Sequence, residues 1–285
     1  MTRLKIAIQK SGRLTTESQA LLKECSIDVK DGKRTLLAPA ENFPIDIFYL
    51  RDDDIPQYLE DGIVDIGILG ENVLIESQKA TKIIKRLGFA KCRLSLAIPK
   101  GENYTGLGYL QGKRIATTYS NIVKQFLADK DIDAEIHEIS GSVEIAPNIG
   151  LAEAICDIVS TGSTLMSNGL KEVETIMRSE AVIAASSTLS AEKNKILEKL
   201  IFRIEAVSAA KRNKYILLNA PNEAINAISS VLPGVKSPTI LPLAEPGWSS
   251  LHSVVDEDAF WDVIEQLKKL GAEGILVVPI EKMIL

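Results

Sequence analysis

The sequence predicts an α/β protein built from two α/β lobes and a small C-terminal domain. Strand-like and helix-like segments alternate through the first two thirds of the chain, and the alternation restarts after Arg93. The last third instead follows the order β-α-β-β-α-β. Alternation of the first kind is typical of βαβ units, and the second order is typical of a ferredoxin-like domain. The length of 285 residues alone suggests about two domains, so this pattern raises the number of compact units to three.

The first lobe is predicted over residues 1–92. Its elements are strand-like runs at Leu4–Ile8, Ile45–Leu50 and Val64–Leu69, and helix-like runs at Thr16–Cys25, Asp53–Asp61 and Glu71–Ser77. Because short apolar runs alternate here with helical segments, we expect a mostly parallel sheet.

The second lobe is predicted over residues 93–180. Its elements are strands at Arg93–Pro99, Arg114–Thr117, Ala134–Ile139 and Ile155–Val159, and helices at Asn121–Asp129 and Ile149–Ala154. The apolar run Val173–Ala185 is either one long strand or a crossing between the lobes. We expect the chain to return to the first lobe at about residues 181–206.

The third and smaller unit is predicted over residues 207–285, after a long amphipathic helix at Ala191–Arg212. Its elements are strands at Lys214–Leu218, Thr239–Ala244, Leu251–Val255 and Ile275–Pro279, and helices at Pro221–Val231 and Asp258–Leu270. Proline at the start of one helix and Gly271 after the other agree with the usual positions of these residues.

Composition and charge exclude several classes of protein. Hydrophobic residues make up 46% and charged residues 25% of the chain, as in ordinary globular proteins. The net charge of −5 argues against a nucleic-acid partner, which would need a strongly basic face. No apolar run approaches the roughly 18 residues of a membrane helix, and the N-terminus lacks the features of a signal peptide. We therefore expect a cytoplasmic protein without a membrane partner.

The loop Ser160–Thr164 is the most informative segment, because it follows a buried strand and precedes a helix. Small and hydroxyl-bearing residues leave several backbone N–H groups free to bind one anion. Asp157, just before the loop, would repel a phosphate unless it binds sugar hydroxyls or a metal ion. A simple polar turn at a helix start remains an alternative. The P-loop and dinucleotide-binding motifs GxxxxGK[ST] and GxGxxG are absent.

The segment Glu144–Leu165 resembles the signature of the ATP phosphoribosyltransferase family. The matching residues are Glu144, Gly150, Ala152, Ile155, Asp157, Thr161, Gly162, Thr164 and Leu165. Five further segments are similar to the same family, namely KSGRL, RDDDIP, DIGILGENVL, SPTILPLAEPGW and GILVVPIEKM. The resemblance covers nearly the whole chain and its length is that of the long form of the family. Ser163 stands where relatives often have alanine.

The resemblance implies the first step of histidine biosynthesis. In that reaction ATP and phosphoribosyl pyrophosphate (PRPP) give N1-(5-phosphoribosyl)-ATP and pyrophosphate, with Mg²⁺ as the cofactor. It also implies a two-lobed fold like that of type II periplasmic binding proteins, followed by an ACT-like ferredoxin domain. The residues expected to bind PRPP are Glu144, Asp157, Ser160, Thr161, Gly162, Ser163, Thr164 and Leu165.

A second group of residues is expected to bind ATP or pyrophosphate. Lys10, Gly12, Arg13, Arg51 and Glu71 follow strands, where open α/β sheets place their ligands. Exposed basic loops, or a carboxylate in the first turn of a helix, are the structural alternatives. The acidic run Asp52–Asp54 is interpreted as a helix N-cap. No residue is assigned as a catalytic acid or base, and Mg²⁺ is expected to bind through substrate phosphates, its protein ligands being unknown.

The C-terminal domain of the family implies feedback inhibition by histidine, bound between neighbouring subunits of a hexamer built from dimers. Asn219, Ser237 and Thr239 are the candidate residues for this effector, with ordinary polarity at strand ends as the alternative. Two other functions remain open. A non-catalytic ligand receptor shares the bilobal fold but does not need the phosphate loop. A phosphoribosyltransferase for a free base or an acid usually has two acidic residues before its loop, whereas Cys156 precedes Asp157 here.

Overall fold

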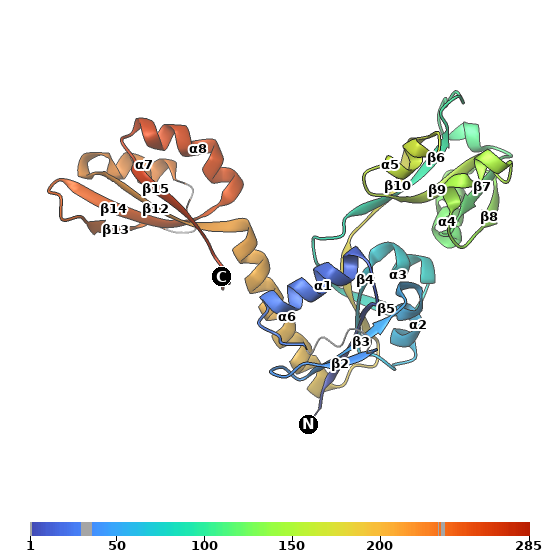
Figure 1. Cartoon of the computed structure of the whole chain (residues 1–285), viewed down its shortest axis with the longest axis horizontal. Coiled ribbons are helices and arrows are strands. Elements are labelled where there is room, and N and C mark those ends of the chain that lie inside the picture. Colours follow the sequence, from blue (N-terminus) through green and yellow to red (C-terminus); the bar gives the residue numbers. More distant parts are fainter. Residues whose placement is uncertain (1, 30–35, 233, 235–236) are drawn as a thin grey trace. The chain divides into compact units, whose positions relative to one another are not determined.

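The computed structural model describes residues 2–29, 36–232, 234 and 237–285. The chain forms two compact units, Met1–Leu197 and Glu198–Leu285. Unit 1 contains two sheets and unit 2 contains one (Figure 1). The division between the units falls inside helix α6 (Ala191–Arg212), which has the predicted bounds. None of the described helices is both long and apolar enough to cross a membrane.

Lobe I of unit 1 is built on a six-stranded sheet in the order β2-β3-β1-β4-β11-β5. Its strands are β1 (Leu4–Gln9), β2 (Leu37–Pro39), β3 (Ile45–Leu50), β4 (Ile66–Gly70), β5 (Thr81–Arg86) and β11 (Ala181–Ser186). Strand β1 is parallel to β3 and β4, whereas the other three pairings are antiparallel. The prediction of a mostly parallel sheet is therefore wrong, because β11 comes from the other lobe and pairs with β4 in the opposite direction.

The parallel strands at the centre of lobe I form its core. Ile6, Ile8, Ile47 and Ile66 are completely buried, which fits the apolar runs of strands covered on both faces. The helices of this lobe are α1 (Arg13–Glu24), α2 (Ile55–Glu60) and α3 (Glu71–Ser77), and the 3-10 turn η1 (Asp52–Asp54) precedes α2. Each helix begins just after a central strand, so the helix starts lie at the carboxyl edge of the sheet.

Lobe II is built on a five-stranded sheet in the order β10-β6-β9-β7-β8. Its strands are β6 (Cys92–Pro99), β7 (Arg114–Thr117), β8 (Glu135–Glu138), β9 (Ala154–Val159) and β10 (Leu170–Ser179). Its two parallel pairings, β9 with β7 and β7 with the edge strand β8, lie at one end of the sheet and the other two pairings are antiparallel, so this sheet is also mixed. Its short helical elements are η2 (Leu107–Leu110), α4 (Ser120–Asp129), η3 (Val143–Ile145), η4 (Pro147–Ile149) and α5 (Ser163–Ser167).

The helix expected at Ile149–Ala154 is not formed. The 3-10 turn η4 starts at Pro147 and stops at Gly150, which has a φ of 72° in the left-handed region that glycine adopts at low cost. Strand β9 then begins at Ala154. Gly150 therefore ends a helical turn at the position where the sequence pattern predicted that a helix begins.

The chain crosses between the lobes twice. Strand β10 belongs to the lobe II sheet and β11 to the lobe I sheet, with a single residue between them, so the run Val173–Ala185 is a crossing. The second crossing connects β5 to β6. The two crossing segments hydrogen-bond to each other, since Leu87 N donates to Ala181 O and Ala181 N donates to Phe89 O. Lobe II is thus connected to lobe I by a pair of bonded segments.

Unit 2 has the predicted ferredoxin-like topology. Its elements are β12 (Asn213–Pro221), η5 (Asn222–Ala224), α7 (Ile225–Val231), β13 (Thr239–Pro242), β14 (Trp248–Asp256), α8 (Glu257–Lys269) and β15 (Glu273–Pro279). The strands form an antiparallel sheet in the order β13-β14-β12-β15. Ile216, Leu251 and Phe260 are buried between this sheet and its helices. Asp256 caps α8 by accepting hydrogen bonds from the N–H groups of Asp258 and Ala259.

Candidate active site

The carboxyl edge of the lobe I sheet collects the residues predicted to bind ATP or pyrophosphate. Because β1 and β3 are parallel and Gln9 lies opposite Leu50, the loop after β1 and the loop after β3 start side by side. Lys10 N donates to Leu50 O at 2.7 Å and fixes this arrangement. Strand β4, on the other side of β1, ends at the same edge. Three neighbouring loops therefore meet where open sheets bind ligands.

The cationic side chains at this edge are exposed. Lys10 and Arg51 are open to solvent, and Arg13, whose side chain is 67% exposed, contacts Glu17 in its own helix at 3.2 Å. An exposed pair of this kind contributes little to stability, so Arg13 can exchange Glu17 for an anionic ligand at small cost. The positive charges of Lys10, Arg13 and Arg51 at this edge are therefore accessible to a ligand from solvent.

Glu71 has a different environment from the cations of the same group. Its side chain is nearly buried at the start of α3 and forms an ion pair with Arg86 on β5. Its backbone N–H donates to Glu180 O, in the crossing between lobes, at 3.0 Å. The structure therefore brings Glu71 to the expected edge with its carboxylate already bound to a cation, and its contact with adenine stays a prediction.

The acidic run after Arg51 forms the turn η1, but the expected capping bond is not made. Neither η1 nor α2 has a side-chain N-cap hydrogen bond within the described residues. Asp52 is partly buried, and one of its oxygens finds no partner there. Burial, followed by the negative charge of Asp53, raises the pKa of Asp52 from 3.8 to about 6. Asp52 is thus a partly buried carboxylate with a raised pKa rather than a helix cap.

The loop after β9 has the form predicted for an anion-binding turn. Gly162 adopts a φ of 83° as the N-cap of α5, and the hydroxyls of Thr161 and Ser163 lie 3.0 Å apart at its tip. The loop start is held from β6, because Arg93 donates to Ser160 O at 3.2 Å while it is paired with Glu172. Thr161 and Thr164 are exposed, so their hydroxyl groups and this part of the loop can contact a ligand.

A cavity of about 210 Å³ joins this loop to two carboxylates. Seven of the eight residues predicted to bind PRPP line it, namely Glu144, Asp157, Ser160, Thr161, Gly162, Thr164 and Leu165. Burial raises the pKa of Asp157, and the nearby charge of Glu144 adds to this effect, whereas the Ile158 N–H opposes it. Cys156, next to Asp157, is completely buried in the core, as expected from the alternation of side chains along a strand.

A larger cavity of about 750 Å³ lies between the lobes and is lined from both sides. Lobe I contributes Asp53, Val73, Glu76 and Ser77, and lobe II contributes Thr118, Tyr119, Glu138, Ile139, Ser140 and Gly141. Burial raises the pKa of the Tyr119 phenol, and the charge of Asp157 adds to the rise. Since the Tyr119 hydroxyl accepts a bond from Asn72 at 3.1 Å, its own proton can be donated to a ligand.

The acidic residues Asp53, Glu76 and Glu138 line this cavity but were not predicted from the sequence as site residues. Asp53 lies in the turn after β3, Glu76 in the last turn of α3 and Glu138 at the end of β8, and nothing local distinguishes an acidic residue of this kind from an ordinary surface carboxylate. For Tyr119 the available signal is its position two residues after the end of β7.

Comparisons with known proteins agree with this geometry. A model of the family described as ATP phosphoribosyltransferase matches residues 51–206, and one described as "HisG, C-terminal domain" matches residues 210–282. The chain is 59% identical over 283 residues to the ATP phosphoribosyltransferase of Cytophaga hutchinsonii, with 99% of each chain covered. It is 57% identical over 282 residues to the enzyme of Phocaeicola vulgatus, covering 99% of this chain and all of that one.

Solved structures support the fold. The ATP phosphoribosyl transferase (HisG:HisZ) complex from Thermotoga maritima contains a chain with 32% identity and a TM-score of 0.60, covering 71% of this chain and 98% of that chain. A periplasmic sulfonate-binding protein from Methylobacillus flagellatus gives a TM-score of 0.51 at 13% identity, covering 74% of this chain and 68% of that one, which concerns the fold alone. The expected two-lobed fold is confirmed. The relatives that match along nearly the whole chain are named ATP phosphoribosyltransferase, which favours this transferase over a ligand receptor or a phosphoribosyltransferase for a free base or an acid. The chain belongs to the ATP phosphoribosyltransferase family, whose reaction is the first step of histidine biosynthesis.

Proposed function

We propose that lobe II holds PRPP at the loop Ser160–Thr164 and that lobe I holds ATP and the departing pyrophosphate. The observation that supports this division most strongly is the cavity that unites the loop with Glu144 and Asp157. A phosphorylated sugar needs both kinds of group, anion donors for its phosphate and acceptors for its hydroxyls. The exposed cations Lys10, Arg13 and Arg51 at the edge of lobe I suit the phosphates of the second substrate.

The 5′-phosphate of PRPP fits the loop because the loop offers donors without a fixed countercharge. Backbone N–H groups around Gly162, together with the hydroxyls of Ser160, Thr161, Ser163 and Thr164, can surround one phosphate. Leu165 closes the cavity on its apolar side and is buried. Asp157 and Glu144 then accept hydrogen bonds from the ribose hydroxyls, an interaction that suits ionised carboxylates.

The reaction itself requires alignment more than proton transfer. Adenine N1 has a free lone pair at neutral pH, so it can attack the anomeric carbon of PRPP while the bond to pyrophosphate breaks. Holding both reactants in line can lower the barrier by about 7–11 kcal/mol. Lys10, Arg13 and Arg51 stabilise the negative charge that builds up on pyrophosphate, and Gly12 allows its loop to approach the phosphates. Glu71 orients the nucleotide from the start of α3.

Magnesium fits the oxygen-rich side of the loop. Asp157 and Glu144 supply carboxylate oxygens of the kind that Mg²⁺ prefers, and the charge between them favours a cation there. The ion itself is proposed to be held mainly by substrate phosphates. When bound, Mg²⁺ neutralises charge on the leaving pyrophosphate.

Unit 2 is proposed to bind the effector histidine through Asn219, Ser237 and Thr239. Asn219 lies opposite Ser250, and Thr239 lies opposite His252. Since residues two apart on β14 share a face, both candidates lie on the side of the sheet that carries the Tyr215–His252–Ser250 hydrogen bonds. Ser237 is exposed just before β13. A polar sheet face of this kind suits an amino acid.

The same sheet face supports a proposed homo-hexamer built from dimers. It also exposes Leu241, Leu276 and Val278, which are 50%, 55% and 44% accessible. Apolar side chains gathered on one uncovered face commonly pack against another subunit. We further propose a cytoplasmic location, where ATP and PRPP are available.

One assay tests the proposed activity. Purified protein is mixed with ATP, PRPP, Mg²⁺ and a pyrophosphatase, and the nucleotide product is followed by chromatography. We expect phosphoribosyl-ATP in an amount that depends on ATP, PRPP and Mg²⁺. Absence of this product at every protein concentration would contradict the proposal, and product formed with free adenine in place of ATP would point to a different acceptor.

A further inference from the structure

Helix α4 of lobe II receives its N-terminal cap from lobe I. Glu76 lies in the last turn of α3, and its carboxylate accepts hydrogen bonds from Asn121 N at 2.9 Å and Ile122 N at 3.0 Å. Ser120 Oγ approaches the same carboxylate at 3.4 Å. Asn121 also donates from Nδ2 to the backbone oxygen of Glu76 at 2.9 Å. The end of α3 in lobe I is therefore hydrogen-bonded to the start of α4 in lobe II.

Helix α4 does not supply this cap itself. The first N–H groups of a helix have no partner inside it, and they are normally bound by a serine, threonine, aspartate or asparagine at the N-cap. The N-cap of α4 is Tyr119, whose side chain makes no capping bond within the described part of the chain. Glu76 provides both the missing acceptor and a negative charge at the positive end of the helix dipole.

A second contact joins the same two elements one helical turn earlier. Asn72 Nδ2 donates to the Tyr119 hydroxyl at 3.1 Å. Residues 72 and 76 are four apart and so lie on one face of α3. Asn72 is fixed in turn by Ser179, at the end of β10, which donates to Asn72 Oδ1 at 2.8 Å and accepts from Asn72 N at 3.0 Å. The contact face of α3 is therefore tied to the crossing between lobes.

We propose that Glu76 is a positioning residue for the transfer reaction, because it sets the alignment of lobe II against lobe I through α4. This inference rests on the proposed binding of PRPP to lobe II and of ATP to lobe I. With the substrates so divided, the approach of adenine N1 to the anomeric carbon depends on how the lobes meet. A small misplacement of reacting atoms lowers the turnover rate more than it lowers the affinity for either substrate.

The test is the variant Glu76→Gln, which keeps the size of the side chain. It removes the charge and replaces one of the two acceptor oxygens with an amide NH₂, which faces an N–H donor, so the cap is weakened. We expect kcat to fall by about tenfold or more. The dissociation constant for PRPP, measured by calorimetry without ATP, should stay within about twofold of the wild-type value, since the PRPP cavity is built within lobe II.

Asp129→Asn is the matched control. Asp129 lies at the other end of α4, lines neither cavity, and accepts from Gln125 at 2.7 Å within lobe II. It therefore removes an equal charge without uncapping α4 across the lobes, and kcat should fall by no more than about threefold. Equal losses in the two variants, an unchanged kcat in Glu76→Gln, or a PRPP affinity that falls together with kcat would each overturn the proposal.

A second variant covers the possibility that Glu76→Gln does not fold. Asn121→Ala removes one side-chain contact with Glu76 and leaves the backbone N–H groups in place, so kcat should fall by about threefold at unchanged PRPP affinity. A wild-type rate in this variant would then overturn the proposal. Inactive wild-type protein would overturn the proposed function together with this inference, whereas active protein that tolerates both variants would overturn this inference alone.

Discussion

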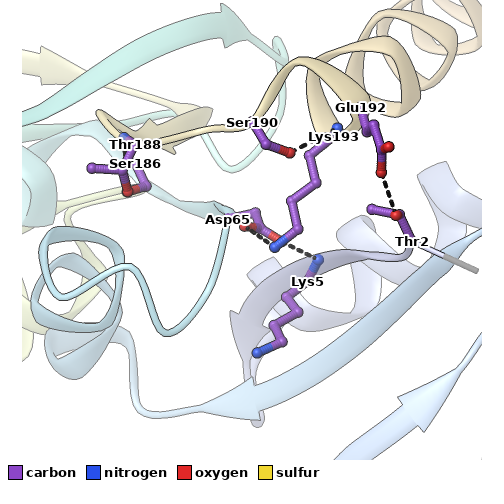
Figure 2. Close-up of polar contacts among 8 residues, drawn as sticks. All are labelled: Thr2, Lys5, Asp65, Ser186, Thr188, Ser190, Glu192 and Lys193. Atoms are coloured by element: carbon purple, nitrogen blue, oxygen red, sulfur yellow. Dashed lines mark hydrogen bonds and ion pairs between the residues drawn. The ribbon is translucent and has the colours of Figure 1, made fainter.

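Lys193 donates a hydrogen bond from Nζ to Asp65 Oδ1 at 2.8 Å, which fixes the first turn of α6 to the start of β4 (Figure 2). Asp65 is only 6% exposed, and its other carboxylate oxygen accepts from Lys5 N at 2.8 Å. Thr2 Oγ1 adds a bond to Glu192 at 2.5 Å. This ion pair therefore anchors the start of α6 to lobe I. Unit 2 begins within the same helix.

Replacing Lys193 with methionine should destabilise unit 1 by about 1–3 kcal/mol. The variant leaves the nearly buried Asp65 carboxylate with the Lys5 N–H but without its cation, and an uncompensated buried charge is costly. The value is below that for a fully buried pair because the Lys193 side chain is 27% exposed. Urea unfolding followed by circular dichroism measures the change.

Lys79→Met is the matched control for that experiment. Lys79 pairs with Glu60 at 2.9 Å, but both side chains are about one-third exposed, at 33% and 34%. Surface pairs of this kind contribute about 0–1 kcal/mol. A loss in Lys79→Met as large as that in Lys193→Met would show that burial of Asp65 is not the cause.

Asp157→Asn should separate function from folding. Burial and the charge of Glu144 raise the pKa of Asp157, so its ionised form weakens the folded state. The neutral amide is therefore expected to leave the melting temperature unchanged or to raise it. Loss of charged bonds to the ribose should nevertheless lower kcat/KM for PRPP by about 30-fold or more. Thermal unfolding and steady-state kinetics give the two values.

The exposed Asp129 on α4 provides the control, since its carboxylate binds Gln125 at 2.7 Å away from the loop. Asp129→Asn should change neither quantity measurably. A melting temperature that drops sharply in Asp157→Asn would instead make Asp157 a structural residue and weaken the assignment of the PRPP site.

Local pattern predicted most of the fold. Helix α3 has the predicted bounds, as does α6, and the ferredoxin-like order of unit 2 follows from its alternating elements. Two strands of lobe I were missed for physical reasons. Strand β2 has three residues, and β5 alternates apolar and charged side chains at the edge of its sheet. Edge strands are short or charged because this discourages pairing with other chains, and these features weaken their sequence signal.

The candidate site was predictable where it is continuous in sequence. The loop from Asp157 to Leu165 is one segment, and so is the turn around Gly12. The partner of Glu71 could not be predicted, because Arg86 lies on the missed strand β5. Likewise the cap between Glu76 and α4 joins residues 45 positions apart, and nothing in either segment indicates the other. Long-range contacts of this kind are set by how the two lobes pack.

Asp52 should make stability depend on pH. Its pKa is raised from 3.8 to about 6, so the folded state binds this proton more tightly than the unfolded state does. The stabilisation is complete below about pH 4 and is lost as the pH rises through about 6. Asp52→Asn has no such proton, so its stability relative to wild type should increase by up to about 3 kcal/mol between pH 4 and pH 7.

Urea unfolding of both proteins across this pH range measures the difference directly. The pH dependence should be steepest between pH 4 and pH 6, where the two states differ most in bound protons. A stability difference between Asp52→Asn and wild type that stays the same from pH 4 to pH 7 would contradict the prediction, because it would show that folding does not change the affinity of Asp52 for its proton.

Thr239→Val should weaken inhibition by histidine. The hydroxyl of Thr239 lies on the sheet face that carries His252 and Ser250, and valine keeps its shape while removing the donor. Loss of one hydrogen bond to a charged ligand corresponds to about a tenfold rise in the half-inhibitory histidine concentration. Ser230→Ala, a change of hydroxyl on α7 whose partner is Ala227 O, should leave that concentration as it is. Equal histidine sensitivity in wild type and Thr239→Val would remove Thr239 from the effector site, and a shift in Ser230→Ala of the same size would show that the effect is not specific to this face.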